Sequence, residues 1–227
     1  MQPVSIDLAL PPVVAPVIVL IGPPGVGKTT VGKALAAELN YQFFDADLLI
    51  ESGTGKSIPQ IFKLYGESEF RRVESEILAR LLEAKTEATT STRQTEVFLT
   101  SRKNHPGPPL GTIVATGAGM PVKPENFRLM ASLGFLIYLA APLNELTLRL
   151  ADSKSRPLLN TLESKIDGGQ TADNATETAA KMLESRLKKL LAQRQRIYEQ
   201  AEFVIETGGR SIPEVVQRII DLLAGTS

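Results

Sequence analysis

The chain has 227 residues, with 25 lysines and arginines against 25 aspartates and glutamates, one histidine and no cysteine. Disulfides, thiol nucleophiles and Cys/His zinc sites are therefore excluded, and a Ser-His-Asp triad would have to use His105. A formal net charge of zero gives no overall attraction for nucleic acid or for an anionic membrane. A length of 227 residues suits one α/β domain over residues 1–227, and the 43% of residues that are hydrophobic can form a large interior.

The N-terminal stretch 8–27 carries no charge, but prolines interrupt it at Pro11, Pro12, Pro16, Pro23 and Pro24. Prolines break helices, so we expect neither a membrane span nor a signal peptide there. We interpret residues 1–16 as an N-terminal extension. We also expect a cytoplasmic protein that works as a monomer, without nucleic-acid or membrane partners.

Short apolar runs alternate with helical patterns along the chain. Residues 17–21 form a continuous β-branched run, and similar runs follow at 112–115, 134–139 and 203–205, with a weaker one at 41–44. Apolar residues recur at helical spacing between them, at Val31, Leu35 and Leu39, and again at Phe70, Val73, Ile77 and Leu81. This order predicts a three-layer α/β/α fold around a five-stranded parallel sheet.

Two segments do not fit that alternation. Residues 85–111 contain a Thr-Thr-Ser-Thr run and end in Pro106-Gly107-Pro108-Pro109, and residues 160–177 contain Gly168-Gly169. Turns tolerate such compositions, whereas cores do not, so we expect both segments to be loop insertions. A long helix that carries Leu183 and Leu187 should follow the second.

A phosphate-binding motif follows the first apolar run directly. Residues 22–29, Gly-Pro-Pro-Gly-Val-Gly-Lys-Thr, match G-x-x-x-x-G-K-[ST] at every fixed position. Its backbone N–H groups and the helix that follows would surround phosphate oxygens, with Lys28 reaching the β- and γ-phosphates and Thr29 ligating Mg²⁺. The alternative is a glycine-rich turn without a ligand. The expected nucleotide site comprises Gly22, Gly25, Val26, Gly27, Lys28, Thr29 and Thr30.

Asp45 and Asp47 follow the second run, at the edge of the sheet where ligands collect in open α/β folds. If the segment is extended, the spacing of two places both carboxylates on one face, where one could orient metal-bound water and the other accept an alcohol proton. Alternatively, either residue simply caps the next helix.

Arg71, Arg72, Arg156, Arg194 and Arg196 are candidates to bind an acidic substrate. A guanidinium group can bind both oxygens of a carboxylate and can stabilise a transferring phosphoryl group. Each arginine alone would be an ordinary surface charge, so their significance depends on the pattern that they form together.

That pattern resembles the shikimate kinases, a family with the P-loop fold of nucleoside monophosphate kinases, from about residue 17 to residue 223. Seven motifs carry the resemblance in the family's order. They are the phosphate loop; Asp45-Ala46-Asp47 with Ile50-Glu51; Gly55-Lys56-Ser57-Ile58; Gly66-Glu67 with Phe70-Arg71 and Glu74; Ala115-Thr116-Gly117-Ala118-Gly119; Arg156-Pro157-Leu158-Leu159; and Arg194 with Tyr198.

The resemblance implies an ATP-dependent kinase, with Mg²⁺, that phosphorylates the 3-hydroxyl of shikimate. Asp47 would contact the ring hydroxyls as the candidate base, Arg71 and Arg194 would clamp the carboxylate, and Glu74 would orient Arg71. Asp45 would act on Mg²⁺ through water. A mobile lid at about 149–160 would bring Arg156 to the phosphates, and Arg149, Arg210 and Ser211 would flank the adenine.

The match has one clear departure. The family usually has three consecutive glycines where this chain has Gly117-Ala118-Gly119. An alanine keeps the backbone N–H, but a positive φ there would cost roughly 1–2 kcal/mol. A kinase for another small carboxylate such as gluconate, a kinase for a nucleotide, and a nucleotide-binding protein without turnover remain alternatives.

Overall fold

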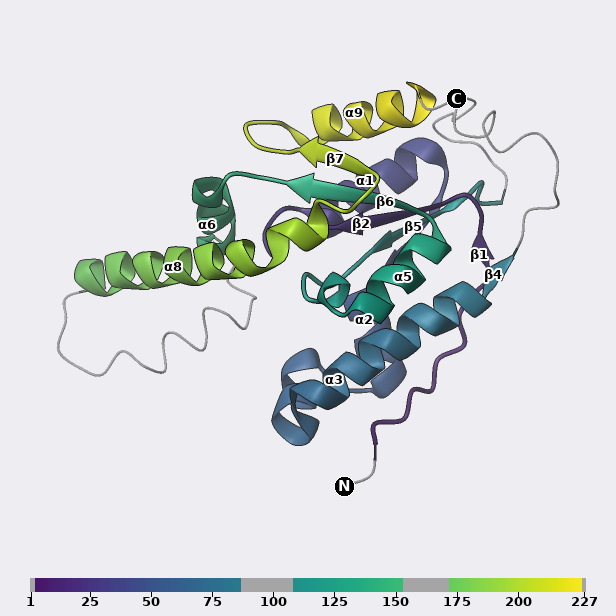
Figure 1. Ribbon diagram of the computed structural model, residues 1–227, viewed down its shortest axis with the longest axis horizontal. Coiled ribbons are helices and arrows are strands. Elements are labelled where there is room, and N and C mark those ends of the chain that lie inside the picture. Colours follow the sequence, from purple (N-terminus) through teal and green to yellow (C-terminus); the bar gives the residue numbers. More distant parts are fainter. Residues whose placement is uncertain (1–2, 87–107, 153–171, 226–227) are drawn as a thin grey trace.

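The computed structural model describes residues 3–86, 108–152 and 172–225. Within them, a five-stranded parallel sheet has the strand order β3-β5-β2-β6-β7 (Figure 1). Its strands are β2 (Val17–Ile21), β3 (Gln42–Asp45), β5 (Thr112–Ala115), β6 (Phe135–Ala140) and β7 (Phe203–Glu206). The predicted α/β class and the five strands are confirmed, and each strand bound lies within one residue of the predicted one.

Helices cover both faces of this sheet. They are α1 (Lys28–Leu39), α2 (Ala46–Thr54), α3 (Ile58–Glu83), α5 (Pro124–Leu133), α6 (Leu143–Ala151), α8 (Ala172–Tyr198) and α9 (Ile212–Gly225), with a short 3-10 helix, η1 (Met120–Val122). Side chains alternate along β2, because successive residues of a strand point to opposite faces. Val19 therefore belongs to the core that α3 and α5 cover, whereas Leu20 belongs to the core that α1 and α9 cover.

Because all five strands are parallel, their carboxyl ends meet at one edge of the sheet. Helix α8 crosses from one core to the other: Leu183 and Leu187 are buried on the α1 side, whereas Tyr198 is buried on the α3 side. Several candidate site residues lie just beyond strand ends, so the fold gathers them.

The N-terminal residues pack into the fold. A second, two-stranded parallel sheet pairs β1 (Val13–Val14) with β4 (Lys85–Thr86), and Val4 and Ile6 are buried against the core. The predicted start of the first insertion is therefore wrong, because its first two residues form β4. At its other end, residues 108–111 form neither helix nor strand, although the N–H of Leu110 donates to Asn40 and the carbonyl of Gly111 accepts from Gln42. Residues 87–107 lie outside the described part.

The second insertion needs a similar correction, because α8 begins at Ala172, and residues 172–177 therefore belong to a helix. Arg149 lies in the last turn of α6. Residues 153–160 of the predicted lid, with Arg156, lie outside the described residues. Among the helices that the structure describes, no helix is long and apolar enough to cross a membrane.

Helix α3 contains a sharp break at Gly66, where φ is 85° and ψ is 175°. Such a backbone conformation lies outside the helical region, and glycine adopts it without steric cost. The break separates residues 58–65, which follow α2, from residues 67–83, which carry Arg71 and Glu74.

Candidate functional site

The phosphate loop joins β2 to α1 in the way the motif requires. Gly22, Gly25 and Gly27 all have positive φ. A Cβ on Gly22 would lie 2.5 Å from the carbonyl oxygen of Leu139, so only glycine fits there. The Lys28 ammonium donates to the carbonyl oxygens of Gly22 and Pro23 at 2.9 and 3.0 Å, which places its charge over the loop.

Two cavities adjoin this loop, with volumes of about 510 and 520 Å³. Gly25 and Gly27 line both, so the loop forms a wall between them. The first cavity also contains Val26, Thr30, Arg149, Thr207, Arg210, Ser211 and Val215. The second also contains Lys28, Thr29, Asp45, Asp47, Glu51, Ser57, Thr116 and Ala118. The phosphate loop therefore lies between two cavities.

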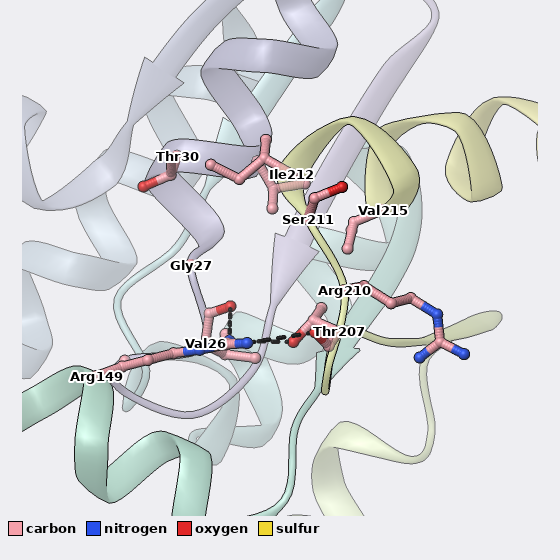
Figure 2. A pocket seen from close by; sticks show the side chains of 11 residues that line it. Val26, Gly27, Thr30, Arg149, Thr207, Arg210, Ser211, Ile212 and Val215 are labelled. Atoms are coloured by element: carbon pink, nitrogen blue, oxygen red, sulfur yellow. Dashed lines mark hydrogen bonds between the residues drawn. The ribbon is translucent and has the colours of Figure 1, made fainter.

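The first cavity is shown in Figure 2. Arg149 donates to the carbonyl of Val26 and the hydroxyl of Thr207, both at 3.3 Å, and so links the phosphate loop to the loop after β7. Arg210 donates to the carbonyls of Glu206 and Gly208, and its guanidinium extends away from the other lining side chains (Figure 2). The N–H and hydroxyl of Ser211 both donate to Glu214, so Ser211 holds the start of α9.

Thr29 and Asp45 form an oxygen pair beside the phosphate loop. The Thr29 hydroxyl donates to Asp45 Oδ2 at 2.7 Å, while Asp45 Oδ1 accepts from the N–H groups of Asp47 and Leu48. The predicted cap of α2 by Asp45 is therefore confirmed, and the contact with Thr29 leaves its second carboxylate oxygen facing the phosphate loop. A hydroxyl and a carboxylate suit Mg²⁺, which prefers oxygen ligands and completes its shell with water and substrate phosphates.

Asp47 lies in the first turn of α2, and the prediction that it shares an extended segment with Asp45 is wrong. The cap by Asp45 starts the helix at Ala46, so Asp47 follows helical geometry. Asp47 nevertheless lines the second cavity with Asp45. A Cβ on Gly117 would lie 2.7 Å from Asp47 Oδ1, which explains why this position needs a glycine.

Arg71 and Glu74 form the charged pair that the motif predicts. Arg71 donates to Glu74 at 2.8 Å and to Glu67 at 3.1 Å. The Glu74 side chain is 1% exposed, and this burial raises its pKa from 4.5 to about 7, although Arg71 acts in the opposite direction. The pKa of Arg71 rises, because its bonds to Glu74 and Glu67 outweigh burial. The buried Glu74 carboxylate thus holds the guanidinium of Arg71 in place.

The Gly117-Ala118-Gly119 loop lies against both candidate arginines. A Cβ on Gly119 would lie 2.5 Å from Arg71 Nη1, and Arg194 donates to the carbonyl of Ala118 at 3.3 Å. Among the described non-glycine residues, only Asn40 has a positive φ, so the Ala118 methyl causes no left-handed strain. The two glycines are therefore needed for close approach, whereas the central position accepts alanine.

Tyr198 is a further functional candidate, named in the sequence analysis only as part of a motif with Arg194. Its hydroxyl donates to the carbonyl of Ala118 at 2.6 Å, and its ring is buried 5.3 Å from that of Tyr138. Burial raises its pKa, opposed by Arg194, so the hydroxyl keeps its proton and remains a donor. The signal was present in the pairing of Arg194 with Tyr198 at helical spacing.

Glu51 and Ser57 also line the second cavity, although the sequence offered them only as parts of motifs. Glu51 accepts from the N–H of Ile58 at 2.9 Å, and Ser57 caps α3. Both residues therefore shape the connection between α2 and α3.

Comparison with known proteins gives a consistent result. The family model described as shikimate kinase matches residues 24–97 and 85–224. The shikimate kinase of Burkholderia thailandensis is 34% identical over 204 residues, which is 89% of this chain and 87% of that protein. The shikimate kinase of Synechococcus elongatus is 35% identical over 205 residues, or 90% of this chain and 84% of that protein.

Solved structures agree with these sequence matches. The shikimate kinase of Acinetobacter baumannii, solved in complex with shikimate, is 30% identical and has a TM-score of 0.68, with 93% of this chain and 94% of that chain covered. The shikimate kinase of Aquifex aeolicus is 28% identical and has a TM-score of 0.63, with 92% and 97% covered.

Proposed function

The chain belongs to the shikimate kinase family, and we propose that it transfers the γ-phosphoryl group of ATP to the 3-hydroxyl of shikimate across its phosphate loop. The resemblance drawn from the seven motifs is thereby confirmed. The relatives' activity supports the reaction, and the two cavities on either side of the loop support its division between two ligands. The roles of individual residues follow from where each lies.

ATP would occupy the first cavity, with its adenosine beside Arg149 and the 207–211 loop and its phosphates at the phosphate loop. The N–H groups of the loop and the start of α1 favour phosphate oxygens there. Lys28 already lies over the loop, so a small movement of its ammonium would bring it to the β- and γ-phosphates. Arg156 is proposed to neutralise the same charge.

Mg²⁺ would be held beside Thr29, with Asp45 acting through water. When bound, the ion supplies neutralisation of phosphate charge. The protein's own contribution is to keep the Thr29 hydroxyl and the Asp45 carboxylate together in the wall of the second cavity, beside the phosphate loop.

Shikimate would occupy the second cavity and extend past Ala118, so that its carboxylate reaches Arg71 and Arg194, which do not line the cavity but lie against the 117–119 loop. The buried Glu74 beneath Arg71 is the observation that carries this assignment. It holds the guanidinium in one orientation beside Gly119, and the bidentate fork of arginine matches a carboxylate. Arg194 reaches the same loop from α8 through the carbonyl of Ala118.

The transfer itself is a substitution at phosphorus. Asp47 orients the 3-hydroxyl and accepts its proton as the oxygen bonds to the γ-phosphorus, while the bond from that phosphorus to the β-γ bridging oxygen breaks and ADP leaves. Every residue in this scheme comes from a single chain, so a monomer would suffice. Since the chain lacks cysteine and suits a reducing compartment, the proposal places the reaction in the cytoplasm.

Arg71→Lys tests the carboxylate clamp. The variant keeps the charge but loses the fork, so we expect the KM for shikimate to rise roughly 10- to 100-fold and the KM for ATP to stay within about twofold. Arg196→Lys, on an exposed position of α8, is the matched control and should leave both constants unchanged. A coupled ADP-release assay measures all variants with shikimate, gluconate and a nucleoside monophosphate. Turnover of either other acceptor in preference to shikimate would contradict the proposal.

A further inference from the structure

Residues 3–14, here called the N-terminal strap, run beside α3 in the direction of that helix (Figure 1). The N–H of Val4 donates to Glu69 at 2.7 Å, and its carbonyl accepts from Arg72. Further along, Arg80 donates to the carbonyls of Ile6 and Leu8 at 3.1 and 3.4 Å. Arginines and a glutamate from successive turns of α3 thus bind the backbone of the strap.

The strap contacts α2 as closely as it contacts α3. The N–H of Asp7 donates to the carbonyl of Gly53 at 2.8 Å. A Cβ on Gly53 would lie 2.9 Å from Ile6 Cγ2 and 3.1 Å from Leu8 Cβ, so the strap and α2 touch at a position without a side chain. Val4 and Ile6 are 5% and 8% exposed, and they complete the apolar core under these helices.

Its other end is fixed to the sheets. The N–H of Val13 donates to the carbonyl of Ala84 at 2.8 Å, and β1 pairs with β4. The carbonyl of Pro12 accepts from Gln42 on β3, and that of Val14 accepts from Thr112 on β5. The strap therefore connects the first residues of strands β3 and β5 to helices α2 and α3, which carry Asp47 and Arg71 of the proposed shikimate site.

The strap also spans the break at Gly66 that separates the two parts of α3. Residues 58–65 are tied to α2 through the bond from Ile58 to Glu51, but residues 67–83 continue from a non-helical joint. A Cβ on Gly66 would meet nothing within 4 Å, so no packing at that position fixes the joint. The strap binds α2 at Gly53 and α3 at Glu69, Arg72 and Arg80, and it thereby spans the joint.

The surfaces that the strap holds lie next to the acceptor site. Arg72 binds the strap, whereas its neighbour Arg71 pairs with Glu74 and lies against Gly119. Gly53 contacts the strap near the end of α2, whereas Asp47 lines the second cavity from the start of that helix. We propose that the strap is a positioning element that sets the separation between Asp47 and Arg71, an inference that rests on the roles proposed above for these two residues.

A substrate held at both its carboxylate and its reacting hydroxyl requires that separation to be correct, and small displacements of reacting groups are costly. Loss of the strap should therefore impair use of shikimate. The first cavity contains no residue of the strap, α2 or α3, so use of ATP should be maintained.

The test compares full-length variants in the ADP-release assay. Ile6→Asp places a carboxylate at the buried contact with α2, and hydrogen exchange at the Asp7 amide reports whether the strap is released. We expect the KM for shikimate to rise about tenfold and the KM for ATP to stay within about twofold. Ile6→Val should behave as the wild type. Leu223→Asp, a buried position on α9 in the other core, is the control for general destabilisation and should leave the KM for shikimate unchanged.

Release of the strap without a change in the KM for shikimate would overturn the proposal. If Ile6→Asp does not fold, Arg80→Gln decides, because it removes the bonds to Ile6 and Leu8 from a partly exposed side chain, and unchanged kinetics there would equally overturn the inference. Arg71→Lys, measured in parallel, distinguishes the proposal for the strap from the proposed function. If Arg71→Lys raises the KM for shikimate and neither strap variant does, the role of Arg71 is supported and the role of the strap is refuted. If none of the three variants raises it, the proposed role of Arg71 is refuted as well.

Discussion

The two cavities beside the phosphate loop are built in different ways. The first cavity, proposed for the nucleotide, is lined on one side by the phosphate loop and the start of α1, and on the other by Arg149, the loop after β7 and the start of α9. The groups proposed to bind the acceptor are side chains from α2, α3 and α8 around the loop after β5, and the buried Glu74 carboxylate pairs with one of them. The backbone groups of the phosphate loop remain in place after most substitutions, whereas a site built from distant side chains depends on the packing of every helix that carries them.

Lys28→Ala should have the largest effect and should fall on transfer alone. Removing a cation that stabilises developing phosphate charge should lower kcat by about 1,000-fold. Shikimate binding, measured by calorimetry, should remain, because the groups that hold the carboxylate lie on α3 and α8. Loss of shikimate binding in a folded variant would show that the two sides are not separable.

Glu74→Gln tests the buried carboxylate through pH. Burial raises the pKa of Glu74 to about 7, above the ordinary 4.5, so the folded state binds this proton more tightly than the unfolded state. The stability from this group is complete below pH 4.5 and is lost as the pH rises to about 7, by about 3 kcal/mol. Glutamine cannot ionise, so the difference in unfolding free energy between wild type and variant should change across that window. A constant difference from pH 4.5 to 8 in urea titrations would refute the shift.

Gly119→Ala should weaken shikimate binding while it leaves the stability of the fold almost unchanged. Its Cβ would lie 2.5 Å from Arg71 Nη1, which is the end of a long side chain that can move. The fold should therefore lose less than about 1 kcal/mol while the KM for shikimate rises about tenfold through displacement of the guanidinium. Thermal unfolding and steady-state kinetics measure the two quantities, and a large drop in Tm with unchanged KM would be the opposite of what we expect.

Ala118→Gly should have the smallest effect. Because Ala118 has no positive φ, removing its methyl relieves no left-handed strain, and added chain entropy lowers stability by roughly 0.5–1 kcal/mol. The KM for shikimate should stay within about twofold. A tenfold gain in affinity, about 1.4 kcal/mol, would show that alanine at this position weakens the site.

The sequence predicted the phosphate loop between β2 and α1 because that motif is local, with glycines at the positions of positive φ. The acceptor residues could be proposed only through motifs, since Arg71, Gly119 and Arg194 meet through tertiary packing. Asp47 was placed wrongly because a Phe-Asp-Ala-Asp segment suits both an extended end and a helix start, and the cap by Asp45 decides between them.

The contacts of the strap could not be predicted from the sequence. Proline and small apolar residues at 3–14 suggest an extension, and nothing local reveals that Arg72 and Arg80 bind its carbonyls. The φ of Ala118 was likewise undetermined from sequence. In the structure this φ is not positive, and the Ala118 carbonyl accepts from Arg194 and Tyr198.

The strand order also has a consequence for how the chain reaches its folded state. Strand β2 lies at the centre of the sheet, yet Val17 pairs with Thr112 and Ile18 pairs with Phe135. Contacts so distant in sequence form slowly, because a long loop must close before they can form. During synthesis on the ribosome, the strand before the phosphate loop therefore emerges early and waits without either neighbour until β5 and β6 follow, which exposes an apolar segment to aggregation for that interval.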